Sequence, residues 1–417
     1  QVLTSDGTDI AWGDAASGIE WQSVQTTGFT ASAGNAYPCN TTSAAFTVTL
    51  PASASVGDQV QILDYAGTFN TNNLTVNPNG LKIQTDTGNR LFNTNRIALT
   101  FTYLDSTQGW SLSSGYLEST NPFYVPPYDI DFLVVAGGGG GGRGTGSTAV
   151  NSGAGAGGYR NSYDSESSGG GGTSEASLTF VSGTTYTITV GAGGAGGTGS
   201  NVPSALGNNG SDSSISGSGI TTITSSGGGG GGRGNYGTNG LDGGSGGGGG
   251  GADSTPNTGG TGTANQGYNG SANYTSADYS AGAGGGAGAI GGTPTGSASG
   301  NGGVGLSSSI TGTAVFRAGG GGGGAQGASV SSGTGGNGGG GNGGANGSNG
   351  NNGTANTGGG SGGSGTGSGT GGSGGSGVVI LRMPTDSYSG TTTGSPTVST
   401  DGTDTILIYN ASGSYTG

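Results

Sequence analysis

The sequence predicts a chain with essentially no α-helix, built from β-strands and from extended glycine-rich segments. Glycine supplies 110 of the 417 residues, about a quarter, where soluble proteins average about 7%. It does not recur strictly at every third position, which excludes collagen. Stretches near both ends of the chain alternate apolar and polar residues, the period of a strand with one buried face. The glycine-rich part has no helical apolar period, and its glycines would destabilise a helix.

Shifts in composition divide the chain into four regions. The first carries alternating strand patterns, the second is a proline-containing connector, the third holds most of the glycine, and the fourth returns to strand patterns. The predicted regions are an all-β module at 1–116, a connector at 117–129, a glycine-rich domain at 130–384 and a C-terminal β segment at 385–417.

The all-β module contains several predicted strands. The segments "AFTVTLP" and "IALTFTYL" each place alternate apolar residues on one face, which needs a partner surface. These residues are Phe46, Val48 and Leu50 in the first strand, and Ile97, Leu99, Phe101 and Tyr103 in the second. The segment "LTVNPNGLKIQT" predicts two strands joined by a tight turn at Asn79-Gly80. Trp12, Trp21 and Trp110 are expected to pack in the core or at an interface rather than bind a ligand.

The segment "DFLVVAGGGGGGRGTG", residues 131–146, begins as a buried strand and then enters six glycines. A nucleotide-binding turn would require a helix next, and the following residues have no helical pattern. A flexible linker remains a serious alternative, because tracts such as "GGGSGGSGTGSGTGGSGGSG" resemble spacers. Against it, six-glycine runs start at Gly137, Gly227 and Gly319, and the first two are followed by arginine in the same frame.

The third interpretation is a domain of packed polyglycine-II-type helices. Segments without side chains can approach as closely as backbone hydrogen bonding allows, as at the collagen axis. Each backbone N–H and C=O would then find a neighbour, and the polar and aromatic interruptions would lie at the ends of the bundle. The strand patterns "DIDFLVVA" and "GVVILRMP" bracket this domain, and "SLTFVSGTTYTITVGAGG" predicts a hairpin within it.

Charge and composition exclude several functions. The net charge is −13, with 21 acidic and 8 basic residues, and the basic residues are dispersed. We therefore expect no nucleic-acid binding, which needs clustered Lys and Arg. No run of 18 apolar residues occurs, so no membrane insertion is expected. The chain has no histidine and one cysteine, Cys39, so the common zinc sites and the Ser-His-Asp triad are not available. We expect no enzymatic activity, no cofactor and no metal.

The motifs resemble a known family over nearly the whole chain. The segments "DFLVVAGGGGGGRGTG", "GAGAGGYR", "TYTITVGAGGAGG" and "GGSGVVILRMP" resemble the glycine-rich distal domain of bacteriophage tail-fibre adhesins. The segments "QVLTSDGTDIAWG", "FTVTLPASASVGDQVQILDYAGTFNTNNLTV" and "YLDSTQGWSL" are similar to modules of phage tail fibres, especially of marine phages. The C-terminal β segment is a departure from a bare glycine-rich tip.

This resemblance implies an extracellular virion protein that binds a host-surface receptor, either a glycan or an outer-membrane protein, through variable loops on a rigid scaffold. Tail fibres of this kind are usually homotrimers, whereas some related adhesins are monomeric caps; the fused β module favours the trimer. A non-viral structural filament or cell-surface appendage is the alternative.

No motif marks the receptor-binding residues, so we select the polar and aromatic interruptions of the glycine-rich domain. Tyrosine combines rigid contact area with a hydroxyl group, which suits an adaptable binding surface. The alternative is that these side chains seal the ends of the glycine bundle. The candidates are Tyr159, Arg160, Tyr163, Tyr236, Tyr268, Tyr274 and Tyr279.

Overall fold

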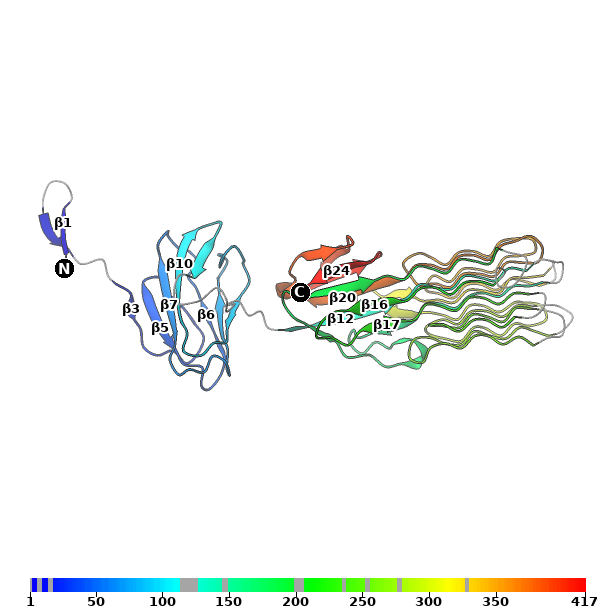
Figure 1. Cartoon of the computed structure of the whole chain (residues 1–417), viewed down its shortest axis with the longest axis horizontal. Helices are drawn as coiled ribbons and strands as arrows, with labels where there is room; N and C mark the ends of the chain where they lie inside the picture. Colours follow the sequence, from blue (N-terminus) through cyan, green and yellow to red (C-terminus); the bar gives the residue numbers. More distant parts are fainter. Residues whose placement is uncertain are drawn as a thin grey trace. The chain divides into compact units, whose positions relative to one another are not determined.

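The computed structural model of the chain divides into two compact units, Gln1–Pro126 and Pro127–Gly417 (Figure 1). The structure describes residues 2–5, 10–13, 18–112, 127–144, 149–198, 206–234, 238–251, 256–275, 280–326 and 330–417. No helix among these residues is both long and apolar enough to span a bilayer.

The first unit is all-β, as predicted. Its strands are β1 (Val2–Ser5), β2 (Ile10–Gly13), β3 (Glu20–Trp21), β4 (Phe29–Thr30), β5 (Asn35–Cys39), β6 (Phe46–Thr49), β7 (Gln59–Asp64), β8 (Leu74–Asn77), β9 (Arg90–Phe92), β10 (Ala98–Asp105) and β11 (Gly109–Leu112). From β3 to β8 the chain alternates between two sheets, so consecutive strands within each sheet run parallel. The sheets have the orders β11-β10-β7-β5-β3 and β4-β6-β8-β9.

The core of the first unit lies between these two sheets. The period-two prediction is confirmed, because Ile97, Leu99, Phe101 and Tyr103 all belong to this core. The same core contains Val48 and Leu50, with Phe46 packed against it. Aromatic side chains from different strands contact each other in this core and stabilise it.

The turn at Asn79-Gly80 forms as predicted, and both residues have positive φ, 55° and 84°. The second strand of the predicted hairpin does not form, since Ile83 makes only isolated bridges to Asp86 and Trp110. The partner of β8 is instead β9. The turn residues fix the local reversal, but pairing depends on which strand offers a matching buried face.

The second unit begins with two sheets. Its strands are β12 (Tyr128–Val135), β13 (Tyr159–Asn161), β14 (Leu178–Phe180), β15 (Thr185–Thr189), β16 (Ser213–Ser216), β17 (Ile223–Ser225), β18 (Leu306–Ser308), β19 (Val315–Arg317), β20 (Val378–Pro384), β21 (Thr391–Thr393), β22 (Thr397–Asp401), β23 (Asp404–Tyr409) and β24 (Gly413–Thr416), with short 3-10 turns at Gly169–Gly171 and Thr385–Ser387. One sheet has the order β13-β12-β20-β23-β22, with β14 also paired to β12, and the other has β17-β16-β15-β24-β21.

The central strands of the first of these sheets are buried on both faces. In β12, Phe132 and Val134 face the core shared with the second sheet, whereas Leu133 and Val135 face a smaller core on the other side. β20 alternates in the same way, which explains the nearly continuous apolar runs of both strands.

One prediction about pairing in this unit is corrected. The segment predicted as a hairpin turns at Gly183, where φ is 75°, but β14 pairs with β12 while β15 pairs with β16 and β24. The strands of the segment 385–417 join both sheets, since β23 pairs with β20 and β24 pairs with β15. Apolar strands at the chain end complete sheets that would otherwise have open edges.

Glycine-rich segments run side by side away from these sheets as extended rods (Figure 1). The rod of residues 137–142 shows the packing, because its N–H groups donate to three neighbouring segments in rotation. In chain order their acceptors are the carbonyls of Ser211, Gly375, Gly155, Asn208, Gly372 and Ser152. Its carbonyls accept, again in order, from the N–H groups of Gly228, Gly194, Ser361, Gly231, Gly197 and Ser364. Every third residue therefore bonds the same neighbour, and the rod has six neighbours, as three-fold polyglycine-II helices require.

At the glycines of this rod, the packing leaves no room for a Cβ atom. A Cβ atom on Gly137 would lie 2.0 Å from the carbonyl oxygen of Ala192, and one on Gly140 would lie 2.0 Å from that of Ala195. The residues that look most like a linker, 358–377, belong to the same lattice, and Ser361 and Ser364 within them are fully buried. The prediction of packed polyglycine-II-type helices is thus confirmed, and the flexible-linker alternative is wrong.

Side-chain amides complete the lattice at its edges. The Oδ1 atoms of Asn349 and Asn352 accept hydrogen bonds from the N–H groups of Thr370 and Ser373, each at 2.8 Å. The neighbouring rod would otherwise present unpaired donors at these positions. The spacing of three residues places both amides on one face of a three-fold helix.

Candidate functional site

The predicted site residues lie in two places within the glycine-rich unit. Four of them, Tyr159, Arg160, Tyr163 and Tyr268, lie where the rods meet the sheets. Tyr274 lies at the opposite end of the rods, and Tyr236 and Tyr279 fall outside the described residues. The seven residues therefore do not form one site.

Arg160 lies on β13 and lines a polar cavity of about 400 Å³. Its guanidinium forms a two-pronged ion pair with Glu175, with Nε–Oε1 at 2.8 Å and Nη2–Oε2 at 2.5 Å. Both side chains are about one quarter exposed, and the hydroxyl of Ser168 lies 3.3 Å from the same carboxylate. Such two-pronged pairs fix geometry as well as charge. The cavity is therefore lined by hydroxyl groups, by amide groups and by an ion pair whose two charges offset each other.

The opposite wall of this cavity comes from residues 264–266. Gln266 is fixed there, because its Oε1 accepts from the N–H of Ser226 at 2.7 Å and its Nε2 donates to the carbonyl of Thr224 at 3.3 Å. Sequence reasoning missed this wall and Glu175. Glu175 lies 15 residues beyond Arg160, so no local spacing links the two.

The structure corrects the prediction for Tyr159, whose side chain is fully buried in the smaller core. Burial raises the pKa of its phenol above the ordinary value, and the negative charge of Glu166 raises it further. A residue on a strand between two packed layers cannot reach a receptor. For Tyr159, the alternative that these tyrosines seal the glycine bundle describes the position better.

Tyr163 and Tyr268 are half-buried. The guanidinium carbon of Arg382 lies 5.0 Å from the centre of the Tyr163 ring, and a cation at this position is attracted to the ring face. Tyr268 is embedded through its backbone, which donates to Gly286 and accepts from Gly246. Both side chains keep part of their surface open near the sheets.

The far end of the rods gathers residues that flank several segments distant in sequence. Val150 forms a bridge with Gly251 and Tyr274 forms one with Ser280. The amide of Asn151 accepts from the N–H of Gly234 at 2.9 Å. These positions adjoin the segments 145–148, 235–237, 252–255 and 276–279, which lie outside the described residues.

The arginines that follow the first two six-glycine runs also lie at this end. Their rods are adjacent, since the N–H of Gly231 donates to the carbonyl of Gly140 at 2.9 Å. Arg233 is 4% exposed, and its N–H donates to the hydroxyl of Thr238 at 2.6 Å. The repeated arginine therefore marks the point at which each rod ends.

A glycine-rich domain family model matches residues 118–384, well over half of the chain. The chain belongs to this glycine-rich domain family. No curated protein matches the chain. The matched range spans the rods and the strands β12 and β20 that bracket them. No group of three or more acidic or cysteine side chains in the described ranges is placed to hold a metal ion.

Proposed function

We propose that this glycine-rich protein is a structural and receptor-binding component of a bacteriophage tail fibre. In this proposal it is an extracellular part of the virion, it attaches to a glycan or an outer-membrane protein of the host, and it assembles as a homotrimer. It has no enzymatic role, needs no cofactor, and neither binds nucleic acid nor inserts into a membrane.

The observation that carries the proposal is the contrast between the two ends of the rods. One end is anchored by sheets with two apolar cores. At the other end, residues from widely separated rods meet within hydrogen-bonding distance. A rod bonded to six neighbours leaves few internal degrees of freedom, so the lattice holds the described ends of the rods in fixed relative positions. Variation of the connecting residues then changes the binding surface without changing the scaffold.

The resemblance to tail-fibre adhesins supports the same proposal, and so does the acidic, histidine-free composition. An adhesive tip needs rigid spacing and contact groups, and it does not need reactive side chains. The cavity at Arg160 is a second candidate surface, because its polar groups are preorganised by the ion pair with Glu175.

Cell binding tests this proposal directly. The fluorescently labelled full chain is incubated with a panel of marine bacterial isolates, and bound fluorescence is measured by flow cytometry. We expect saturable binding to a minority of strains. The double variant Tyr236→Ser, Tyr279→Ser should bind these strains at least about tenfold more weakly, since tyrosine anchors often dominate interfaces.

The matched control is Tyr65→Ser, which alters an exposed tyrosine of the first unit. Unchanged binding by the double variant would remove these two residues from the proposed surface, and absence of binding to every strain would contradict the adhesin role. Helical polymers in micrographs of the purified protein would favour the alternative, a structural filament or surface appendage.

A further inference from the structure

The smaller core of the second unit has an arginine at its edge. Arg317 is the last residue of β19 and is 7% exposed. Its register partner on β18, Leu306, packs against the smaller core, and paired residues of antiparallel strands present their side chains on the same face. The Arg317 side chain is therefore directed toward that core and away from solvent.

The charge of Arg317 has no counter-ion in the described part of the chain. The ion pairs found there involve Arg90, Arg160 and Arg382, and the Nη1 atom of Arg317 is buried without a hydrogen-bond partner. Burial lowers the pKa of this guanidinium, but arginine keeps its proton in proteins. A buried charge without a partner is strongly destabilising, so this position requires a source of negative charge.

Two buried hydroxyl groups lie beside Arg317. The Tyr159 hydroxyl, on β13, also has no hydrogen-bond partner among the described residues. Burial and the charge of Glu166 raise the pKa of its phenol, whereas the Arg317 charge and the Ser308 hydroxyl act to lower it, so both of the latter groups lie close to the phenol. Ser308 is 1% exposed and pairs with Val315, two residues before Arg317, which makes it a diagonal neighbour of the arginine on one face.

These three side chains are hydrogen-bond donors for which the described residues supply no acceptor. The Oγ of Ser308 already accepts from the N–H of Ile310 at 3.2 Å, so its O–H remains to donate. The O–H of Tyr159 and the Nη1–H group of Arg317 remain to donate as well. A cation beside two hydroxyl donors matches a ligand that accepts hydrogen bonds and carries negative charge.

The carboxylate of Glu166 does not fill this role. Its Oε1 accepts from the N–H of Ser309 at 2.7 Å and its Oε2 from the amide of Asn161 at 3.0 Å. Its charge still acts on Tyr159 and therefore opposes a ligand of high negative charge. A single guanidinium next to this carboxylate suits a small monovalent anion better than a phosphate or sulfate dianion.

We propose that Arg317, Tyr159 and Ser308 form a buried binding site for a small monovalent anion of the halide class. The anion accepts hydrogen bonds from the guanidinium and from the two hydroxyl groups, and it neutralises the arginine. Because Tyr159 lies on β13 and the other two residues lie on the β18–β19 hairpin, the bound anion joins this hairpin to the sheet. The ligand is structural, and the site is separate from the proposed receptor-binding surface.

Calorimetry of the full chain tests the site, as sodium gluconate is replaced by sodium chloride or sodium bromide at constant ionic strength. A ligand that binds only the folded state raises the melting temperature with its concentration. We expect the transition of the second unit to rise by about 2–5 °C, while the transition of the first unit stays constant as an internal control. In crystals grown with bromide, an anomalous peak should lie between Arg317 and the two hydroxyl groups.

Variants separate this site from a general effect of salt. Arg317→Met should lose the halide dependence and, in gluconate, should melt no lower than the wild type, because an apolar side chain replaces an unpaired buried charge. Tyr159→Phe removes one donor and should weaken halide binding by about tenfold. Arg96→Gln is the matched control, since it removes the same charge at an exposed position of the first unit, and it should keep the wild-type shift.

Several outcomes would overturn the proposal. Equal shifts of both transitions, or an undiminished shift in Arg317→Met, would indicate a general effect of salt. An anomalous peak without any shift in solution would indicate an adventitious ion only, and a water molecule in place of the halide would remove the site. If Arg317→Met does not fold, the shift of Tyr159→Phe and the bromide peak of the wild type decide the question.

Discussion

The two units bury extended backbone in opposite ways. In the first unit, side chains fill the space between two sheets, and Trp110 and Phe101 are fully buried there. In the rods of the second unit, backbone packs on backbone, and a single added carbon would meet a carbonyl oxygen at about 2 Å. The first unit gains stability from apolar burial. The lattice must rely on complete hydrogen bonding and close contact, against the high entropic cost of ordering glycine. Different substitutions should therefore destabilise the two units.

The largest effect is expected from Gly140→Val. Its Cβ would lie 2.0 Å from the carbonyl oxygen of Ala195, and neither chain can move without breaking bonds to further rods. We expect the second unit to lose its cooperative transition in calorimetry and to become protease-sensitive, while the first unit keeps its own. Gly296→Ala is the control, because its nearest atom would lie at 3.6 Å. A normal transition for Gly140→Val would contradict the lattice.

Phe101→Ala should act on the first unit alone. It removes a fully buried ring that meets Phe92 edge to face at 6.0 Å, and we expect the free energy of unfolding to fall by about 3–5 kcal/mol. Leu104→Ala, at an exposed position of the same strand, should change it by less than about 0.5 kcal/mol. Calorimetry of both variants checks this. A shift of the second transition would show that the two units do not unfold independently.

Polar substitutions should distinguish the inside of the lattice from its edge. Asn151 is fully buried, donates to Ser364 Oγ at 3.0 Å and accepts from the N–H of Gly234. Asn151→Ala leaves that N–H without its acceptor, and we expect a loss of about 2–3 kcal/mol. Asn349→Ala frees an N–H at an exposed edge, where water can replace the amide, and should cost about 0.5–1 kcal/mol. The free energies of unfolding are measured by chemical denaturation. Equal losses for the two variants would mean that water does not replace the amide at the edge.

The smallest effect concerns Cys39, which is buried in the first unit. Burial, and then the charge of Asp64, raises the pKa of its thiol to about 12. Because the folded pKa lies above the unfolded one, the stability contributed by the neutral thiol is complete below about pH 8.5. It is lost as the pH rises toward 12. Denaturation of wild type and Cys39→Ala across this window should show the steeper decline in the wild type, and dithionitrobenzoate should label only unfolded protein. Rapid labelling of the native thiol would contradict its burial.

Much of the architecture was predictable because its signals are local. Alternation placed Leu99 and Phe101 in one core, and Gly402, at positive φ, reverses the chain between β22 and β23. The run of six glycines indicated close approach of chains. Strand pairing was harder to predict from the sequence, as the wrongly predicted hairpin around Gly183 shows. A turn is a property of its own residues, whereas a strand pairs with whichever face matches in the folded chain.

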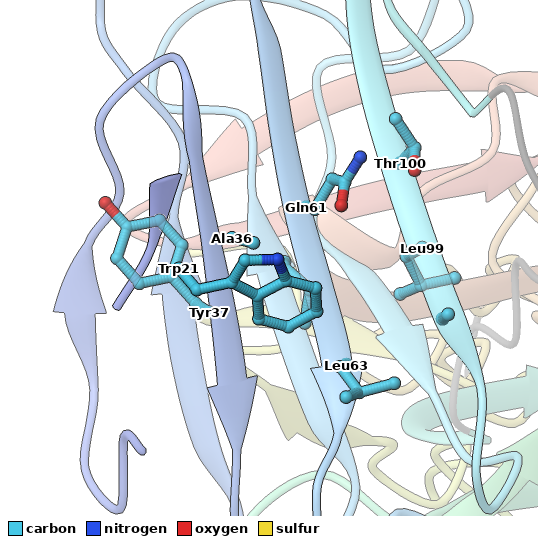
Figure 2. Close-up of a pocket in the computed structure, with 9 residues that line it drawn as sticks. Trp21, Ala36, Tyr37, Gln61, Leu63, Leu99 and Thr100 are labelled. Carbon is cyan, nitrogen blue, oxygen red and sulfur yellow. The ribbon is translucent and has the colours of Figure 1, made fainter. Parts of the chain in front are cut away.

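The candidate sites were less predictable than the fold. Tyr159, a candidate for receptor binding, is buried, whereas Trp21, expected in the core or at an interface, is exposed in the single chain (Figure 2). No local pattern distinguishes an aromatic residue that fills a core from one on the outer face of an edge strand. The ion pair of Arg160 with Glu175 joins residues that lie 15 positions apart, so no local pattern could have predicted it.

The sequence by itself determined that this protein would be nearly free of helix, with apolar strands around a glycine-rich interior, because periodicity and the missing side chains act within a few residues. The tertiary structure alone decided which segments surround each rod, which strands close the sheets and which aromatic residues reach solvent. The physical reason is that glycine segments are nearly identical to one another. Their partners are selected by the register that the anchoring sheets impose and by the asparagine side chains at the edges, and both act across the folded chain.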